Sequence, residues 1–377
     1  MIAARRRLPW GLLGMLALVA GIERFVARHD LDFTTLGAEN MKFTAVASRG
    51  GAGYDVLCFG DSLVKYGIVP RAIEAGTGGR AFNLASAGAT PPASYFMLRR
   101  AIMAGARPSV ILVDFKPNLL AADPRGDLRA YASFADLSES FHLARAAMDG
   151  DFFAAMTMAR LLPSIRARRE VRAGLIRALR GEVGTTREMI PLHRRNWAAN
   201  RGAQINPRSL GVADVAEYWD EKICLDPGWA CHPINRLYVD EFFDLAAQHA
   251  IPVVWLLPPI NPRVQSKRDQ LGLDLIFDRF VREVQTSHPG VRVVDGHHSG
   301  YPVAVFTDSA HLDSHGAHIY SEAIASLLSE LPSPAAGSPA QPWTMLPQFR
   351  DKPIAIPFED LSQSATALRA AARTLRR

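Results

Sequence analysis

The chain is organised around the stretch Tyr54-Asp-Val-Leu-Cys-Phe-Gly-Asp-Ser-Leu-Val-Lys-Tyr-Gly-Ile-Val-Pro70. Its apolar run at 56–59 is bounded by a glycine, which predicts a short buried strand. Gly60, Asp61 and Ser62 interrupt that strand, and residues 63–66 suit one helical turn. Ser62 is therefore expected at the carboxyl edge of a parallel sheet, which is where open α/β folds place their binding and catalytic groups.

Strand-like apolar runs alternate with helical patterns through the rest of the chain. Further strands are predicted at 81–84, 110–115, 252–257 and 291–294. Helices are predicted between and after them, at 70–76, 93–104, 235–250, 273–286 and 316–331. Nearly continuous apolar strands between helices are typical of a parallel sheet that is covered on both faces. The pattern predicts an α/β fold with a doubly wound, five-stranded parallel sheet.

Bulk composition excludes several classes of protein. The chain has 377 residues, of which 48% are hydrophobic and 21% are charged, as expected for a globular protein and not for a disordered one. This length suits either one large domain with appendages or two domains. The net charge is +6, but much of it comes from one arginine-rich region, and no nucleic-acid-binding motif is present. We expect no nucleic-acid partner.

Residues 1–30 have the composition of a targeting segment. The cluster Arg5-Arg6-Arg7 precedes 15 uncharged residues, from Leu8 to Ile22. That run is at the upper limit for a signal-peptide core and slightly short for a membrane span, so a signal anchor, a cleaved signal peptide and an ordinary buried helix all stay open. We favour an uncleaved signal anchor over a cleaved signal peptide. The arginines would keep the N-terminus in the cytoplasm, so that the folded part lies outside the cytoplasm, membrane-anchored or, if cleaved, secreted.

Two other regions depart from the α/β pattern. Residues 119–235 are interpreted as a mostly helical insertion in a domain that covers 31–331, with helices expected at 138–162 and 165–179. Ten arginines and three acidic residues lie between Arg166 and Arg201, which suits a solvated surface or a surface for anionic polymer or lipid headgroups. Residues 332–377 begin as a Pro/Ser/Ala linker and end in a short helix from about 358.

The cysteines indicate little about the chemistry of the protein. Cys58 lies within the first predicted strand and is expected to be an inert core thiol. Cys224 and Cys231 flank a turn-rich loop, where they either form a small disulfide outside the cytoplasm or remain two free thiols.

A base for Ser62 is found near the C-terminal end of the predicted domain. His311 lies in the last loop before the closing helix, and Asp308 precedes it by three residues. In one turn-like segment this spacing lets the carboxylate bind Nδ1 of the imidazole and leaves Nε2 for the serine. Nucleophile, base and orienting acid in that relation form a catalytic triad.

These segments carry a resemblance to a known family. Phe59-Gly-Asp-Ser-Leu63 resembles the first block of the SGNH, or GDSL, hydrolases, and Asp308-x-x-His311-Leu with a following glycine resembles their last block. The family contains esterases, lipases, carbohydrate deacetylases and some acyltransferases, on a flavodoxin-like fold. The resemblance implies that Ser62 is the nucleophile, His311 the base and then the acid, and Asp308 the orienter.

The resemblance also implies an oxyanion hole. Its donors would be the N–H of Ser62, the N–H of Gly88 after the second strand and the amide of Asn118 after the third. The Gly-x-Asn-Asp pattern of the family is absent around Asn118. The chain is thus similar to a divergent branch, with as much likeness to membrane-linked relatives that acetylate polysaccharides as to simple lipases.

Three hypotheses about function follow. The first is a serine esterase or carbohydrate O-deacetylase that forms an acyl-enzyme on Ser62, with an ester or acylated glycan as substrate. The second is an O-acyltransferase that modifies cell-envelope polysaccharide with the same triad. The third is a non-catalytic envelope protein on the same scaffold. No cofactor and no metal are expected, because His311 and His315 lack the intervening glutamate of a zinc-binding helix, and the oligomeric state is not indicated.

Overall fold

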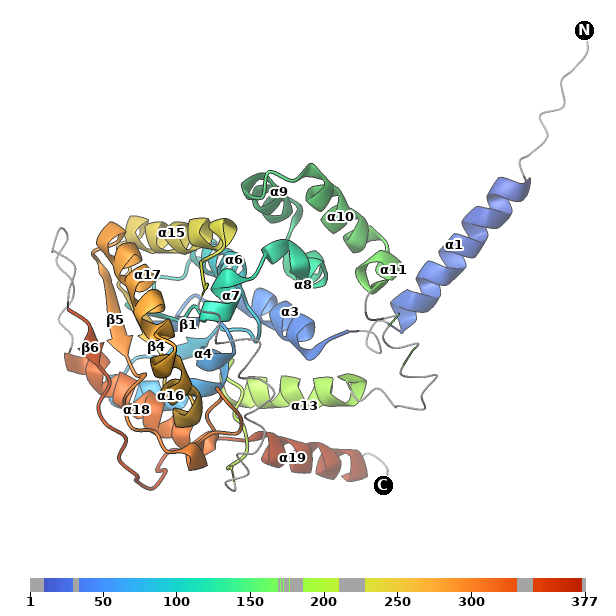
Figure 1. Cartoon of the computed structure of the whole chain (residues 1–377). Coiled ribbons are helices and arrows are strands. Elements are labelled where there is room, and N and C mark those ends of the chain that lie inside the picture. The colour runs from blue at the N-terminus through green and yellow to red at the C-terminus, as the bar shows by residue number, and fades with distance from the viewer. Residues whose placement is uncertain are drawn as a thin grey trace, which may run out of the picture. The chain divides into compact units, whose positions relative to one another are not determined.

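The computed structural model describes residues 10–29, 34–168, 186–209, 228–330 and 342–374, with the isolated positions 170, 172 and 176 (Figure 1). Cys224 and most of the predicted helix at 165–179 lie outside the described residues. The chain divides into two compact units. One contains residues 1–38 and 127–189, and the other contains residues 39–126 and 190–377.

The second unit is an α/β fold around a parallel sheet of six strands. The strand order is β2-β1-β3-β4-β5-β6, with every neighbouring pair parallel. The first five strands follow the flavodoxin-like order. The strands are β1 (Val56–Phe59), β2 (Ala81–Asn83), β3 (Val110–Val113), β4 (Val253–Leu257), β5 (Val291–Asp295) and β6 (Thr344–Met345).

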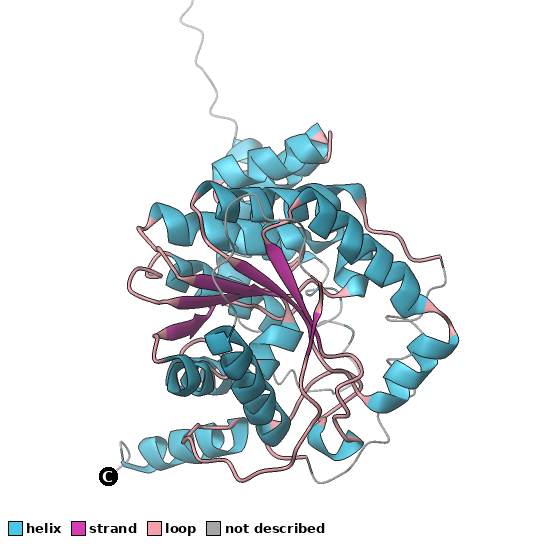
Figure 2. Cartoon of the chain, turned by 90° about the vertical axis from the view of Figure 1, so that its left-hand side faces the viewer, coloured by secondary structure: helices cyan, strands magenta, loops and turns pink. Residues whose placement is uncertain are grey.

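Helices cover both faces of this sheet (Figure 2). All residues of β1, β4 and β5 are buried, as the apolar runs predict for strands without a solvent face. The helix α5 (Pro70–Thr77) packs against α18 (Ser314–Glu330), and α6 (Pro91–Met103) packs against α15 (Pro233–Gln248). The helix α17 (Leu273–Ser287) also lies close to its predicted position.

The expected number of five strands is wrong, because the C-terminal segment adds a sixth. Thr344 pairs with Val294 and Met345 with Asp295, and Leu346 follows with only 3% of its surface exposed. This segment was expected to be part of a linker and short helix. A strand of two residues has no alternation or apolar run of its own, so only its pairing with β5 defines it.

Several helices have no clear signal in the sequence. They are α3 (Leu36–Ser48), α7 (Pro117–Ala121), α13 (Thr186–Ala199) and α16 (Pro262–Gln270). Residues 190–209, expected within the insertion, belong to the unit with the sheet. The C-terminal segment holds them there: the side-chain amides of Asn196 and Asn200 both donate to the Glu359 carbonyl at 2.7 Å, just before α19 (Leu361–Thr374).

The first unit is helical in its described residues. It contains α1 (Trp10–Arg28), α8 (Leu128–Phe134), α9 (Leu137–Ala146), α10 (Gly150–Leu161) and α11 (Pro163–Arg166). The single helix expected at 138–162 is two helices. Met148 has a φ of 49°, which ends α9, and the Asp149 side chain then caps α10 by accepting from the Phe152 N–H at 2.9 Å.

The helix α1 is long and apolar enough to cross a membrane or to act as a signal anchor. It has 19 residues, of which Val26 is the only buried one. A signal sequence near the N-terminus has the same properties, so the signal anchor and the cleaved signal peptide both remain open.

Candidate active site

The turn after β1 is built so that only glycine fits at its first position. Gly60 has a φ of 117°, and a Cβ there would lie 1.9 Å from Asp114 Oδ1 and 2.7 Å from the Asp114 carbonyl oxygen. The close approach brings the end of β1 against the end of β3. Asp61 then caps α4 (Ser62–Gly67) through a hydrogen bond from the Leu63 N–H at 2.7 Å. Ser62 therefore begins this helix at the carboxyl edge of the sheet.

A chain of hydrogen bonds joins Ser62, His311 and Asp308. The Ser62 Oγ lies 2.8 Å from His311 Nε2, and His311 Nδ1 lies 2.7 Å from Asp308 Oδ2. An ionised carboxylate only accepts hydrogen bonds, so Nδ1 carries the imidazole proton and Nε2 accepts from the serine hydroxyl. The serine and the histidine that this hydrogen bond joins lie 249 residues apart in sequence.

The loop before α18 holds Asp308 ionised. Its Oδ1 accepts from the N–H groups of Ala310 and His311, both at 2.8 Å. Burial raises the pKa of Asp308, but the hydrogen bond and charge of His311 and the two backbone donors outweigh it and lower the pKa to about 2. A carboxylate with such a pKa is charged at neutral pH, as an orienting acid must be.

Tyr66 supports the imidazole from the side and was not singled out from the sequence. Its ring meets the His311 ring edge-on, with centroids 5.1 Å apart. It lies four residues after Ser62 on the same helix face, and side chains with this spacing are neighbours on a helix. Burial, and next the Asp308 charge, raise the pKa of Tyr66 to about 12, so it remains a neutral phenol.

The two expected oxyanion donors follow the strands on either side of β1. Gly88 is the third residue of a turn closed by the Ala89 N–H and the Ser86 carbonyl, with a φ of 74°. Asn118 lies in α7, just after β3, and its buried Oδ1 has no hydrogen-bond partner among the described residues. Neighbouring parallel strands end at one edge, so these loops flank Ser62, although no hydrogen bond within the described part of the chain joins them to the triad.

Two further groups behind Ser62 were not identified as part of the site from the sequence. The first is Asp114, whose Oδ1 accepts from the Asp61 N–H at 3.0 Å. Burial raises the pKa of both carboxyls, and the Asp61 charge raises that of Asp114 further. The charge of either carboxyl therefore disfavours ionisation of the other.

The second group is Lys65, which is fully buried in α4. Its Nζ donates to the Ala85 carbonyl at 3.3 Å and to the Gly202 carbonyl at 3.2 Å. Burial lowers the pKa of Lys65 to about 7. This side chain ties the helix of Ser62 to the loop that leads to Gly88. Lys65 lies one helical turn after Ser62, and its place in the sequence does not show which way its side chain points. Only the packing of residues 200–205 against it reveals that it faces inward.

A mainly apolar pocket opens beside the triad. It is bounded by the loop after β3, the end of β4, and Ser309 and Ala310 between the acid and the base of the triad. Its apolar lining includes Leu63, Phe115, Leu257, Ile260, Val264 and Phe277. Such a lining suits the hydrocarbon part of a bound group, while His311 and Asp308 remain partly open, with 23% and 34% of their side chains exposed.

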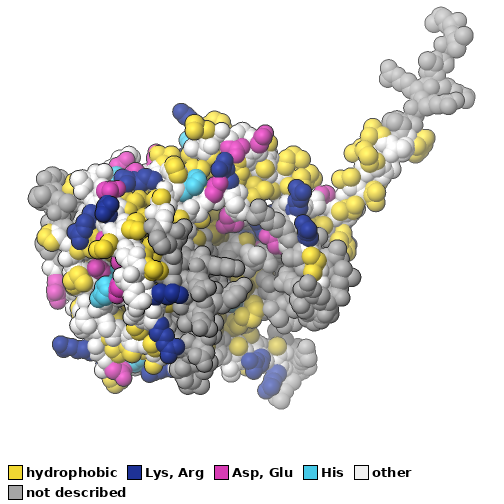
Figure 3. Space-filling view, in the orientation of Figure 1, with side chains coloured by type: hydrophobic (Ala, Val, Ile, Leu, Met, Phe, Trp, Pro, Cys, Tyr) yellow, Lys and Arg dark blue, Asp and Glu magenta, His cyan; other side chains and the backbone are white. Residues whose placement is uncertain are grey.

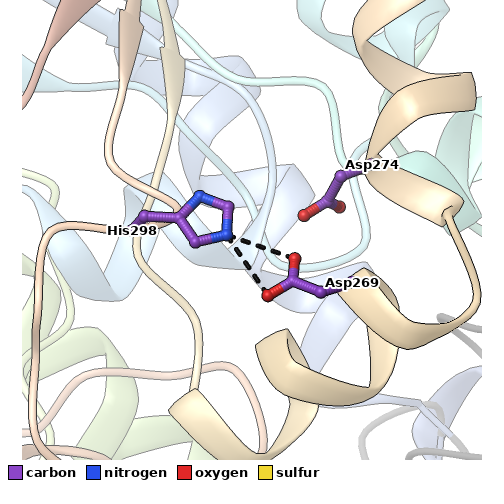
Figure 4. Close-up of side chains that lie close together, drawn as sticks. All are labelled: Asp269, Asp274 and His298. Atoms are coloured by element: carbon purple, nitrogen blue, oxygen red, sulfur yellow. Dashed lines mark hydrogen bonds and ion pairs between the residues drawn. The ribbon is translucent and has the colours of Figure 1, made fainter.

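One group of possible metal ligands occurs among the described residues: Asp269, Asp274 and His298 (Figure 4). His298 Nε2 lies 3.2 Å and 3.3 Å from the two Asp269 carboxylate oxygens. Asp274 accepts instead from Arg268 Nε at 2.7 Å. The buried guanidinium already supplies the positive charge that a cation would bring, so the cluster is explained as an ion-pair network.

The histidine pair His311 and His315 is separated by the start of α18. His315 lies within that helix and its Nε2 is 2.6 Å from Asp351 Oδ1, whereas His311 precedes it. Cys58 is a buried thiol whose pKa is raised by burial, as expected for an inert core cysteine.

Among known protein families, no family model matches the chain. No curated protein matches its sequence either. The function is therefore inferred from the geometry of the chain's own residues.

Proposed function

We propose that the protein is a serine hydrolase of the SGNH/GDSL class that cleaves ester bonds through an acyl-enzyme on Ser62. The observation that carries this proposal is the hydrogen-bond chain from Ser62 Oγ through His311 to an ionised Asp308. A serine, a correctly oriented imidazole and a buried carboxylate in this order have the geometry that activates a hydroxyl for acyl transfer.

In the first half of the reaction, Ser62 Oγ attacks the ester carbonyl while His311 Nε2 takes its proton. Asp308 holds the Nδ1 proton and stabilises the imidazolium. The N–H groups of Ser62 and Gly88 and the side-chain amide of Asn118 would donate hydrogen bonds to the oxyanion. The tetrahedral intermediate then collapses, the C–O bond to the leaving group breaks, and His311 gives that oxygen its proton.

In the second half, His311 removes a proton from water, which attacks the acyl carbon on Ser62. The acid leaves and the proton returns to the serine oxygen. The apolar pocket beside Ser309 and Ala310 would receive the acyl group, which agrees with a small or apolar acyl chain. Simple aryl esters and O-acetylated glycans are the substrate classes that this arrangement favours.

The experiment that tests the proposal compares Ser62→Ala with Ser326→Ala, an exposed serine on α18. Hydrolysis of an aryl acetate should fall to the uncatalysed rate in the first variant and remain unchanged in the second. A fluorophosphonate should label the unaltered protein at Ser62. Full activity of Ser62→Ala would contradict the proposal. Failure of the fluorophosphonate to label Ser62 would favour a non-catalytic envelope protein on the same scaffold.

A second candidate is an O-acyltransferase with the same triad, in which a sugar hydroxyl replaces water as acceptor. The observation that favours it is α1, which could hold the enzyme at a membrane close to envelope polysaccharide. The acyl-enzyme is common to both reactions, so the acceptor separates them. Acylated glycan formed at the expense of free acid, when an acceptor glycan is added, would establish transfer.

We further propose that α1 is an uncleaved signal anchor and that the catalytic unit lies outside the cytoplasm. The apolar length of α1 supports an anchor, and the arginines before it support this orientation. Fusion of alkaline phosphatase to the C-terminus tests the side, because that enzyme is active only outside the cytoplasm. Release of a shortened chain into the medium would indicate a cleaved signal peptide instead.

A further inference from the structure

The helix α10 is apolar on two opposite faces. Phe152, Met156 and Ala159 are buried within its own unit. Ala154, Met158 and Leu161 point the other way, with Met158 42% and Leu161 68% exposed. A helix that is apolar all round is normally buried in protein or in lipid. The described residues leave this outer face of α10 uncovered.

The neighbouring helix α9 extends the same surface. Leu137 and Phe141, one turn apart, have 56% and 53% of their surface exposed. The Phe141 ring meets the half-buried Phe153 of α10 edge-on at 5.9 Å, so the exposed side of α9 lies beside α10. We call Leu137, Phe141, Ala154, Met158 and Leu161 the outer apolar face. Figure 3 shows hydrophobic side chains gathered over α10 and along α1.

The membrane-spanning candidate α1 is fastened next to this face. Its Glu23 carboxylate accepts from the Ser164 N–H at 3.0 Å and also from the Ser164 hydroxyl. Ser164 lies in α11, which begins two residues after α10 ends. The bonds satisfy the one carboxylate of α1, so that a charged residue is tolerated close to an apolar environment. The contact joins α11, which follows α10 in the chain, to the last turns of α1.

The length of the apolar segment places this contact at the membrane surface. The hydrocarbon core is about 30 Å thick, which requires roughly 20 helical residues. The helix α1 comes close to this length, because it has 19 residues and ends at Arg28. Glu23 lies five residues before this end, about 7.5 Å along the helix axis, so its contact with α11 lies near the boundary of the bilayer. Exposed Arg28, at the end of the helix, would then lie at the level of the headgroups.

We propose that the outer apolar face of α9 and α10 rests in the interfacial layer of the same bilayer that α1 enters. Helices with this role insert their apolar side chains at the boundary between headgroups and acyl chains. The occupant of the face is lipid, because α11, the next helix after α10, is bonded to α1, the one helix among the described residues that is suited to a bilayer. The inference concerns attachment and is independent of the esterase chemistry.

The test places spin labels on the full-length chain in lipid nanodiscs. In a Cys224→Ser, Cys231→Ser background, single labels are attached through Phe141→Cys, Met158→Cys or Leu161→Cys. The matched control is Met103→Cys, on α6 of the other unit, where the methionine is 75% exposed. Circular dichroism and the melting temperature of each labelled protein establish that it is folded, and three separate positions keep the test valid if one variant fails.

Collision rates with oxygen and with a water-soluble nickel complex are then measured. The ratio of oxygen to nickel accessibility should be several-fold higher at 141, 158 and 161 than at 103. Equal ratios at all four positions, with free access for nickel, would overturn the proposal. Shielding of the three positions from both reagents would overturn it as well, because it would indicate a protein partner or a second copy of the chain in place of lipid.

Discussion

At the scale of single residues, one proton decides whether Ser62 can act as a nucleophile. Asp308 accepts from His311 Nδ1 at 2.7 Å, and this fixes the tautomer whose Nε2 faces the serine. The sequence predicts these three residues from two short motifs, at 59–63 and 308–312, and from their resemblance to a known family. It does not show that Tyr66, Asp114 and Lys65 pack around these residues, because their contacts depend on the orientation of α4 and of the end of β3.

Asp308→Asn should lower kcat by about 10³–10⁴-fold with little change in stability. The asparagine amide can donate to Nδ1, which moves the imidazole proton to Nε2 and leaves no base for Ser62. Steady-state hydrolysis of an aryl acetate measures the effect. The control is Asp351→Asn, which alters the separate Asp351–His315 pair and should leave kcat unchanged. If Asp308→Asn retains kcat within tenfold, Asp308 is not the orienter.

Lys65 predicts a dependence of stability on pH. Its pKa is about 7 in the folded protein, against 10.5 as the ordinary value. Between these values the unfolded chain binds more protons than the folded one, so Lys65 makes stability rise with pH, by at most about 1.4 kcal/mol per pH unit. Thermal unfolding at pH 7 and pH 9.5, in detergent, should show a larger gain for the unaltered protein than for Lys65→Met. Equal gains would show that Lys65 keeps its ordinary pKa.

At the scale of elements, the turn between β1 and α4 fixes the position of Ser62. The sequence predicts the strand, the turn and the helix, since the apolar run and the following polar residues are local signals. The need for glycine at position 60 arises from β3, whose Asp114 occupies the space of a side chain.

Gly60→Ala should destabilise the protein by ~3 kcal/mol or more and abolish esterase activity, because the new Cβ meets the Asp114 backbone at a strained φ. Gly78→Ala is the matched control: Gly78 has a φ of 73° and open space around it. That change should cost about 1 kcal/mol and leave kcat unaltered. Chemical denaturation of both variants makes the comparison, and equal losses would contradict the role of the close approach.

At the scale of the whole molecule, the C-terminal segment completes the unit that carries the site. It adds β6 to the edge of the sheet, and Leu361 N–H donates to the Ile205 carbonyl at 3.0 Å. Arg195 Nε also pairs with Glu359 Oε1 at 2.7 Å. The segment thereby holds residues 190–209 in place. Within them, the Gly202 carbonyl accepts a hydrogen bond from Lys65 Nζ.

Removal of residues 342–377 should lower the melting temperature by several degrees. The buried amides of Asn196 and Asn200 would lose partners, at about 1–3 kcal/mol for each unsatisfied group. Removal of 371–377 alone, where the described side chains are exposed, should have little effect. Calorimetry in detergent distinguishes the two, and equal melting temperatures would show that the segment is dispensable.

The sequence by itself determined what local pattern can determine. Apolar runs predict five of the strands, the helices that follow them and the N-terminal apolar helix, and short motifs predict Ser62, Asp308 and His311. Tertiary structure alone decided the sixth strand, the break between α9 and α10, and the residues packed behind Ser62. The reason is physical: an apolar run carries its own burial signal, whereas a two-residue strand, a buried lysine or a pair of buried carboxyls is defined only by partners far away in the chain.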